Sequence, residues 1–327
     1  MKVLIVGYGS MGRRRIRLYK QLDKDAQFIC VDSNPERIKQ INEDGYTAFA
    51  DLNEAVKENL DLAFVSTSPL SHAAIIPVLL QNKINTFTEI NLSSKNYDQM
   101  ISLAKENHVK LFLSSTMLYK NQIKKIKELV QKESQPLTYI YHIGQYLPDW
   151  HPWESYKNFF IGKKESNGCR EIYAIQLPWI VDTFGEVAKL NSVSHKSTKL
   201  EIDYDDSYIT TFEHKNGNKG VFVVDVVSRV ATTYLEVIGE NIHLTWDGSN
   251  EGLKIFNIAE KKIETFTAYE NEVHNENYSA NIVENTYLDE IKDFISYVKN
   301  GTEPKWSIQK DYEMLKLIDE IEKYNAD

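Results

Sequence analysis

The first residues of the chain combine a short apolar run with a glycine-rich turn, and this combination can hold a phosphate. Gly7, Gly9 and Gly12 follow the apolar residues 3–6 directly, and a predicted helix at residues 13–22 comes next. In this context Gly7 permits a tight turn, Gly9 lets the backbone approach a pyrophosphate, and Gly12 lets the helix close on the strand. The helix N-terminus attracts the phosphate charge. The pattern predicts a dinucleotide-binding turn, against the alternative of an ordinary glycine-rich turn.

A carboxylate at the end of the second predicted strand can bind the ribose of the same cofactor. Asp32 follows the strand at residues 27–31 and lies about twenty residues beyond the glycines, where a Rossmann unit places its ribose-binding acid. The alternative is a turn residue at the end of a strand. Because the carboxylate would repel a 2′-phosphate, NAD is favoured over NADP. Arg37, one turn later, keeps NADP as the second choice.

The other candidate cofactor residues lie in the glycine turn or at the carboxyl ends of predicted strands. Ligands bind at that edge of a parallel sheet. These candidates are Tyr8, Ser10, Met11, Ser66, Thr67, His72 and Glu89. For His72 the alternative is packing or capping at a helix start, and for Glu89 it is a surface position.

Composition and charge exclude several classes of protein. The 327 residues are 42% hydrophobic and 26% charged, as in soluble globular proteins, and a net charge of −9 argues against a general nucleic-acid binder. The run Arg13, Arg14 and Arg15 is interpreted as a solvated helix face. Cys30 and Cys169 have neither metal-ligand nor disulfide spacing. No signal peptide, membrane span or metal is predicted, and we expect a cytoplasmic protein.

Strands and helices alternate through the first part of the chain, which predicts an α/β fold with a doubly wound parallel sheet. After the first two strands, strands are expected at residues 47–50, 61–66, 85–89 and 110–113. Helices are expected from residue 33 and at residues 52–58, 71–81, 97–107 and 122–131. A dinucleotide-binding Rossmann domain is therefore assigned to residues 1–118.

From residue 137 the predicted elements become strands joined by hairpin turns. These strands cover residues 137–147, 206–214, 220–228, 232–239, 241–246, 252–257 and 262–267, and helices are predicted at 176–190, 285–299 and 307–324. The pattern predicts an α+β domain, a mainly antiparallel open sheet with helices on one face, for residues 119–327. This domain would bind substrate and form oligomers, and its last helices could pack back on the first domain.

Several spaced segments resemble the glucose–fructose oxidoreductase / inositol 2-dehydrogenase (Gfo/Idh/MocA) family. They are Val65-Ser-Thr-Ser-Pro-Leu-Ser-His72, Phe87-Thr-Glu-Ile-Asn-Leu-Ser93 and the helix and glycine stop at residues 287–301. The start Gly-x-Gly-Ser-x-Gly-Arg-Arg and residues 146–152 are similar to a bacterial branch associated with sugar and surface-glycan pathways. The resemblance implies an NAD(P)-dependent oxidoreductase that transfers a hydride to or from a sugar or a sugar-derived molecule. We expect a homodimer or homotetramer.

Three positions depart from the family's pattern. The family's catalytic lysine, in a Glu-Lys-Pro-Leu motif, falls on Ile90, and the proline falls on Asn91. The histidine of its substrate helix falls on Ile175 or Gln176, and neither is a general base. The resemblance therefore implies that this chain lacks the usual lysine and histidine.

Other side chains would then have to transfer the proton. Tyr173 and Asp182 lie on the segment similar to the family's substrate helix, and His151 lies on the loop before it. Tyrosine normally titrates near 10, so Tyr173 would need a neighbouring cation, and a packed tyrosine is the alternative. For Cys169 a buried inert thiol is favoured over a nucleophile.

Aromatic and basic residues supply the candidate substrate contacts. Trp150 and Trp153 can stack on sugar rings and Lys157 can bind hydroxyls, although the loop could instead form an oligomer interface. Arg170 could anchor a carboxylate or phosphate, with an ion pair to Glu171 as the alternative. Trp179 completes the set.

Two functions remain open from the sequence. One is an oxidoreductase with altered catalytic groups, and the other is a redox-silent member that binds dinucleotide or sugar as a sensor or partner protein. The glycines and Asp32 fit both functions, whereas Ile90 and Ile175 favour the second.

Overall fold

The chain divides into two compact units in the computed structural model, which describes residues 1–151, 154–269 and 283–323. Unit 1 comprises Met1–Ser115 and Tyr287–Glu313, and unit 2 comprises Thr116–Thr286 and the residues from Met314. Helix α9 (Ile308–Lys323) contributes residues to both units. Among the described residues, no helix combines the length and apolar content needed to cross a membrane.

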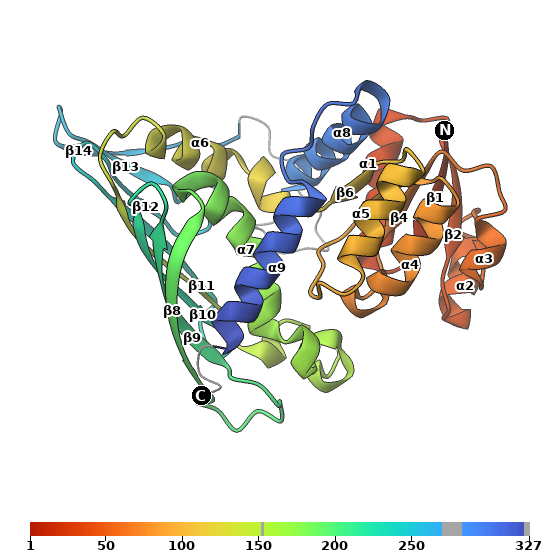
Figure 1. Ribbon diagram of the computed structural model, residues 1–327, viewed down its shortest axis with the longest axis horizontal. Helices are drawn as coiled ribbons and strands as arrows, with labels where there is room; N and C mark the ends of the chain where they lie inside the picture. Colours follow the sequence, from red (N-terminus) through yellow and green to blue (C-terminus); the bar gives the residue numbers. More distant parts are fainter. Residues whose placement is uncertain (152–153, 270–282, 324–327) are drawn as a thin grey trace. The chain divides into compact units, whose positions relative to one another are not determined.

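Unit 1 contains a six-stranded parallel sheet in the order β3-β2-β1-β4-β5-β6 (Figure 1, red to yellow). Its strands are β1 (Lys2–Val6), β2 (Gln27–Val31), β3 (Thr47–Phe49), β4 (Leu62–Val65), β5 (Asn85–Thr88) and β6 (Leu111–Leu113). The strand order reverses between β1 and β4, and this switch point is where such sheets bind ligands at their carboxyl ends. The predicted doubly wound Rossmann sheet is confirmed.

Helices α1 (Ser10–Leu22), α2 (Pro35–Glu43), α3 (Leu52–Ala55), α4 (Pro69–Gln81) and α5 (Tyr97–Glu106) connect these strands. Most of α8 (Glu284–Asn300) also belongs to unit 1. The ring of Phe294 in α8 lies 5.7 Å from that of Phe64 and 5.6 Å from those of Phe87 and Phe112. Because burial of one such ring stabilises by roughly 1.5–3 kcal/mol, this contact fixes α8 on the Rossmann sheet.

Unit 2 contains an eight-stranded sheet in the order β14-β13-β12-β11-β7-β10-β9-β8. Its strands are β7 (Thr138–Gly144), β8 (Val187–His195), β9 (Ser207–His214), β10 (Lys219–Asp225), β11 (Thr232–Ile238), β12 (His243–Trp246), β13 (Lys254–Asn257) and β14 (Lys262–Thr265). Every described pairing is antiparallel except that of β7 with β10. The predicted, mainly antiparallel second sheet is confirmed.

One face of this sheet packs against helices and the other is open. Figure 1 shows α6 (Asn121–Val130) and α7 (Gly168–Phe184) on the same side of the sheet. Tyr139 and Tyr141 of β7 are fully buried, and Tyr139 stacks on Phe184 of α7 at 4.0 Å. Ile140 between them is 38% exposed, as the alternation of side chains along a strand requires.

The helix predicted at residues 176–190 is wrong in its bounds, and a strand was missed. Helix α7 begins at Gly168, where the Asn167 side chain accepts a hydrogen bond from the Arg170 amide at 2.7 Å. Pro178 therefore lies inside the helix, although proline favours the first turn. Gly185, with φ +104°, ends the helix, and β8 follows with a mostly polar, half-exposed sequence.

Candidate cofactor and catalytic site

The turn between β1 and α1 leaves no room for side chains at two of its glycines. Gly7 has φ +94°, and a Cβ there would lie 2.7 Å from the Ser66 carbonyl oxygen. A Cβ on Gly12 would lie 2.0 Å from the Gly7 carbonyl oxygen. Gly9 is the N-cap residue of α1 and has no side chain to cap it. The turn therefore presents backbone rather than side chains at the carboxyl end of β1, as a phosphate cradle requires.

Asp32 is fixed against this turn. Its Oδ2 accepts a hydrogen bond from the Tyr8 amide at 2.8 Å, and its Oδ1 accepts one from the Asn34 amide at 2.9 Å. Nη1 of Arg37 lies 3.5 Å from Asp32 Oδ2 and 3.3 Å from the position of a Cβ on Gly9. The glycine turn is thus bordered by a buried carboxylate and by a half-exposed guanidinium.

The other candidate residues of the turn, Tyr8, Met11 and Ser10, differ in burial and in hydrogen bonding. The Tyr8 hydroxyl donates to Asp44 Oδ2 at 2.6 Å, and burial raises the pKa of Tyr8, so its side chain points to the protein interior. The sulfur of Met11 accepts a hydrogen bond from Arg14 Nη1 at 3.1 Å. Ser10 is exposed at the start of α1. For Tyr8, therefore, the backbone and not the side chain is the candidate cofactor contact.

Two of the three arginines that follow the glycines are buried. Arg14 is 2% exposed and Arg15 is fully buried, which corrects the expectation of a solvated face. The Arg15 guanidinium bonds Glu89 at 2.7 and 2.9 Å and lies 4.3 Å from the centre of the Phe87 ring. Burial of this cation is stabilised by acidic partners distant in sequence, which no local pattern reveals.

Glu89 therefore belongs to a buried charge cluster at the carboxyl end of β5. Arg15 Nη2 also bonds Glu290 of α8 at 3.0 Å, and Glu290 Oε1 accepts from the Ser115 amide at 2.6 Å. Burial raises the pKa of Glu290, while Arg15 opposes that rise. Glu89 is 13% exposed on its side chain, so one edge of the cluster reaches the surface.

His72 is packed inside unit 1, as its alternative interpretation expects. It is 1% exposed, its Nε2 lies 3.2 Å from the Thr67 carbonyl oxygen, and its Nδ1 lies 2.6 Å from Asn91 Oδ1. Burial lowers the pKa of His72. The ring joins the turn after β4 to the turn after β5. The hydroxyl of Ser66 is buried without a hydrogen-bond partner in the described part of the chain.

The proton-transfer candidates of unit 2 are engaged with neighbouring side chains. Tyr173 is fully buried, its hydroxyl lies 3.0 Å from Thr210 Oγ1, and burial raises its pKa. Asp182 Oδ2 forms an ion pair with Lys127 at 2.7 Å. The His151 ring lies 4.5 Å from the Phe159 ring, and burial lowers the pKa of His151.

The substrate candidates of α7 are also packed within unit 2. Arg170 forms ion pairs with Asp319 and Glu322 of α9, rather than the pair with Glu171 named as its alternative. Trp179 is fully buried, and its Nε1 donates to Gln176 Oε1 at 2.8 Å. The thiol of Cys169 is 1% exposed, and burial raises its pKa, which favours an inert role.

In the loop before α7, Trp150 is half-buried and its Nε1 donates to the Gln145 carbonyl at 3.0 Å. Lys157 forms an ion pair with Glu201 at 2.6 Å, and both side chains are exposed. Trp153 lies outside the described residues. Among the described residues of this loop, Trp150 thus presents a partly exposed indole.

Glu171 is a further candidate, which its sequence context does not reveal. This half-buried carboxyl lies in the first turn of α7, and burial raises its pKa to about 7. Within the described residues its side chain has no hydrogen bond or ion pair. A carboxyl group that titrates near neutral pH is suited to general acid–base work. In the sequence it is visible only as an acidic residue in a first turn, which helix electrostatics explain equally well.

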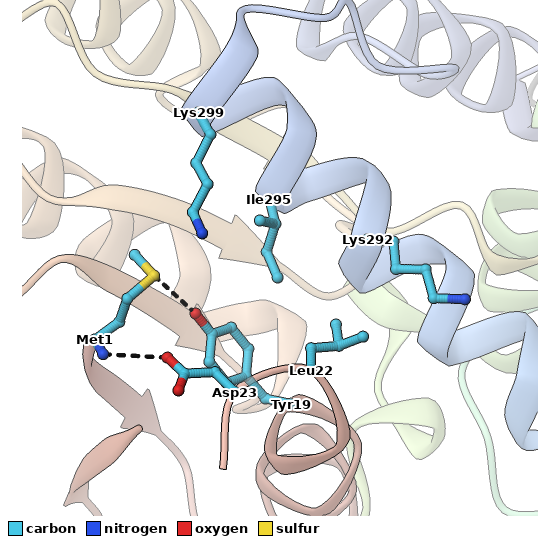
Figure 2. A pocket seen from close by; sticks show the side chains of 7 residues that line it. All are labelled: Met1, Tyr19, Leu22, Asp23, Lys292, Ile295 and Lys299. Atoms are coloured by element: carbon cyan, nitrogen blue, oxygen red, sulfur yellow. Dashed lines mark hydrogen bonds and ion pairs between the residues drawn. The ribbon is translucent and has the colours of Figure 1, made fainter. Parts of the chain in front are cut away.

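A separate pocket of unit 1 contains none of these residues. It has a volume of about 270 Å³ and is lined by Met1, Tyr19, Leu22, Asp23, Lys292, Ile295 and Lys299 (Figure 2). The Met1 amine pairs with Asp23 at 3.1 Å beside it. The pocket lies at the amino end of β1, whereas the glycine turn follows its carboxyl end. In the described parts of the chain, no cluster of His, Cys, Asp and Glu could hold a metal ion.

Comparisons with known proteins give a family match for residues 1–115 and a fold match for the whole chain. Residues 1–115 match the GFO_IDH_MocA family model, described as an oxidoreductase family with an NAD-binding Rossmann fold. A myo-inositol 2-dehydrogenase of Thermotoga maritima is 24% identical over 136 residues, which cover 40% of this chain and 41% of that enzyme.

Two solved structures match the whole fold. An oxidoreductase from Agrobacterium radiobacter, solved with NAD+, L-tartaric acid and magnesium, has a TM-score of 0.86 and 14% identity over 100% of this chain and 96% of that one. A levoglucosan dehydrogenase solved with NADH and L-sorbose has a TM-score of 0.83 and 14% identity over 100% and 97%. Residues 1–115 thus match the model of an oxidoreductase family with an NAD-binding Rossmann fold, and the chain as a whole has the fold of these two solved structures.

Proposed function

We propose that the chain is an NAD(P)-dependent oxidoreductase that transfers a hydride to or from a sugar or a sugar-derived small molecule. The glycine turn carries the proposal, because Gly7 and Gly12 leave no space for a Cβ at the sheet edge where dinucleotides bind. The names of the similar proteins, myo-inositol 2-dehydrogenase and levoglucosan dehydrogenase, favour a polyhydroxylated substrate.

The residues of unit 1 fit a dinucleotide. The glycine turn and the start of α1 would bind the pyrophosphate, Asp32 would accept hydrogen bonds from ribose hydroxyls, and the buried Ser66 hydroxyl would gain a partner. When bound, the nicotinamide would supply or accept the hydride. Asp32 favours NAD, although Arg37 lies close enough to the turn to contact a 2′-phosphate.

We propose Glu171 as a further proton-transfer candidate, beside His151. At the position that resembles the family's lysine, Ile90 can neither donate a proton nor polarise a carbonyl oxygen. The hydroxyl of Tyr173 and the carboxylate of Asp182 already bind Thr210 and Lys127. With a pKa of about 7, the Glu171 carboxyl is present in both protonation states at neutral pH, so it can accept a hydroxyl proton or return it.

The test is a screen of sugars, inositols and sugar nucleotides for NADH formation. On any substrate that turns over, Glu171→Gln should lower kcat by about 10²–10⁴-fold while the Kd for NADH stays unchanged. Tyr173→Phe is the matched control and should retain activity. Loss of activity in Tyr173→Phe with full activity in Glu171→Gln would return the role to the tyrosine.

The second candidate function is a redox-silent dinucleotide- or sugar-binding protein. The engagement of Tyr173 and Asp182 with other side chains favours it, because both were candidate proton-transfer groups. The same screen separates the two functions. Tight NADH binding without turnover of any tested substrate would support the silent member.

We further propose that the open face of the second sheet joins copies of this chain. Val193, Ile209 and Tyr234 lie on that face and are 59%, 44% and 41% exposed. Val193 and Ile209 are paired across β8 and β9, and Tyr234 lies on β11 of the same sheet. Exposed apolar side chains on one face favour association. Light scattering should give a dimer or tetramer that Ile209→Lys dissociates. A wild-type monomer would contradict this assignment.

A further inference from the structure

A continuous chain of hydrogen-bonding side chains crosses the interior of unit 1 and ends at the turn after β4. His72 Nε2 lies 3.2 Å from the Thr67 carbonyl oxygen, and His72 Nδ1 lies 2.6 Å from Asn91 Oδ1. Asn91 Nδ2 lies 2.7 Å from the Tyr97 hydroxyl, which bonds the Asp311 carboxylate. The exposed fractions are 1% for His72 and Tyr97, 3% for Asn91 and 4% for Asp311.

When Asp311 is ionised, donor and acceptor chemistry fixes the direction of every hydrogen bond between Asp311 and His72. The carboxylate can only accept, so the Tyr97 hydroxyl donates to it. The hydroxyl oxygen then accepts from the Asn91 amide nitrogen, which turns Asn91 Oδ1 toward His72. Because Oδ1 can only accept, His72 carries its proton at Nδ1. A neutral ring then has a lone pair at Nε2, and this lone pair faces the Thr67 carbonyl without a hydrogen bond.

Protonation of Asp311 reverses the direction of these hydrogen bonds. The carboxyl proton is donated to the Tyr97 oxygen, and the hydroxyl donates to Asn91 Oδ1 after the amide turns over. The amide nitrogen then donates to His72 Nδ1, so the single ring proton resides on Nε2 and bonds the Thr67 carbonyl. Burial lowers the pKa of His72, which favours the neutral ring.

Thr67, at one end of this series of hydrogen bonds, adjoins the glycine turn. A Cβ on Gly7 would lie 2.9 Å from Thr67 Cγ2 and 2.7 Å from the Ser66 carbonyl oxygen. The backbone after β4 is therefore packed directly on the cradle, and the β5 turn that contains Asn91 ends at the same sheet edge. A change in the bond to the Thr67 carbonyl thus acts on a cofactor-facing turn.

We propose that Asn91 is a positioning residue through which protonation of Asp311 places the ring proton of His72 and so holds or releases the Thr67 carbonyl beside the dinucleotide cradle. Only the last step, a change in cofactor affinity, rests on the proposed function. Asp311 faces the Tyr97 hydroxyl and Nε1 of Trp306, which donates to it at 3.2 Å. His72 also faces the Thr88 hydroxyl at 3.2 Å and the charge of Glu89.

The first experiment reads the ring proton directly in the full chain without cofactor. Nitrogen-15 NMR of histidine-labelled protein reports which ring nitrogen is protonated, and His72→Gln assigns the signal. The wild type should carry the proton at Nδ1 at pH 8 and at Nε2 at pH 5, whereas Asp311→Asn should give Nε2 at both. In Tyr97→Phe the signal should no longer depend on pH. The same His72 tautomer in the wild type at both pH values would overturn the proposed relay, the series of hydrogen bonds from Asp311 to His72.

The second experiment measures cofactor affinity by NADH fluorescence. The wild type should bind NADH more tightly at pH 5 than at pH 8, by up to about tenfold, the equivalent of one hydrogen bond. Asn91→Leu should lose this dependence. Asn85→Leu, the same substitution at the amino end of β5, should keep it. If Asn91→Leu keeps the dependence, Asn91 has no positioning role. Failure of the wild type to bind NADH would overturn the proposed function, and the NMR result would still decide the relay.

Discussion

The guanidinium of Arg15 in α1 holds the Glu89 carboxylate through two hydrogen bonds, 2.7 Å from Nε to Oε1 and 2.9 Å from Nη2 to Oε2. The same Nη2 bonds Glu290 of α8 at 3.0 Å. One buried cation thereby joins the carboxyl end of β5 to two helices of unit 1. With two carboxylates around one guanidinium, loss of the cation would leave negative charge buried without a partner.

Replacement of Arg15 should therefore strongly destabilise unit 1. Arg15→Met should lower the free energy of unfolding by about 3–5 kcal/mol, the usual cost of breaking a buried ion pair. Arg13→Met on the same helix is the control, because Arg13 is exposed and its Nη1 donates to the neutral side chain of Gln40 at 3.1 Å. Its cost should stay within about 0.5 kcal/mol. Urea unfolding followed by circular dichroism measures both, and equal losses would contradict a special role for Arg15.

Stability should also depend on the protonation of Asp311. Burial raises the pKa of this carboxyl from 3.8 to about 6. The folded state then binds the proton more tightly than the unfolded state, so this stabilisation is complete below pH 3.8 and is lost as pH rises through about 6. A shift of about two pKa units corresponds to about 3 kcal/mol. Unfolding free energies of wild type and Asp311→Asn should diverge by that amount between pH 4 and 7, whereas parallel pH profiles would refute the shift.

Cofactor preference should follow the two charges beside the glycine turn. Asp32→Ala should remove the repulsion of a 2′-phosphate and let NADPH bind at least as tightly as NADH, because Arg37 remains beside the turn. In the double variant with Arg37→Ala, the gain for NADPH should disappear. Calorimetric titrations with both cofactors measure this. Tighter binding of NADPH than NADH by the wild type would show that Arg37 outweighs Asp32.

The indole of Trp150 should contribute to substrate binding alone. Trp150→Ala should weaken binding of a sugar or inositol ligand by about 0.5–1.5 kcal/mol, while Trp150→Phe keeps an aromatic face and most of the affinity. The Kd for NADH should not change in either variant, because the glycine turn belongs to unit 1 and Trp150 to unit 2. Unaltered ligand affinity in Trp150→Ala would favour an assembly role for the loop.

The local patterns of the sequence predicted most of the fold. The buried run of β1, the glycines after it and Asp32 after β2 are neighbours in sequence, so their spacing alone indicates the strand, turn and helix. The helix around Pro178 was given wrong bounds, and the strand β8 was missed, for a local reason as well. Proline favours a first turn, and the mostly polar residues of β8 hide its alternation.

The charge cluster and Glu171 depend on contacts that the sequence does not display. Arg15 and Glu290 are 275 residues apart, so an arginine run beside the glycines resembles an ordinary solvated helix face. The pKa of Glu171 rises only because tertiary packing removes water from the carboxyl. Similarly, the relay from His72 to Asp311 joins residues far apart in the chain.

Binding of the dinucleotide tests the central claim most directly. Calorimetric titration of the full chain with NADH should show one site per chain, and Gly12→Val should abolish it, because a Cβ there would meet the Gly7 carbonyl oxygen at 2.0 Å. Gly45→Ala is the control: alanine at its φ of +81° strains the backbone locally, but nothing lies within 4 Å of a Cβ at that exposed position, so NADH should still bind. Absence of NADH and NADPH binding by the folded wild type, or equal binding by Gly12→Val, would contradict the assignment of a dinucleotide-dependent oxidoreductase.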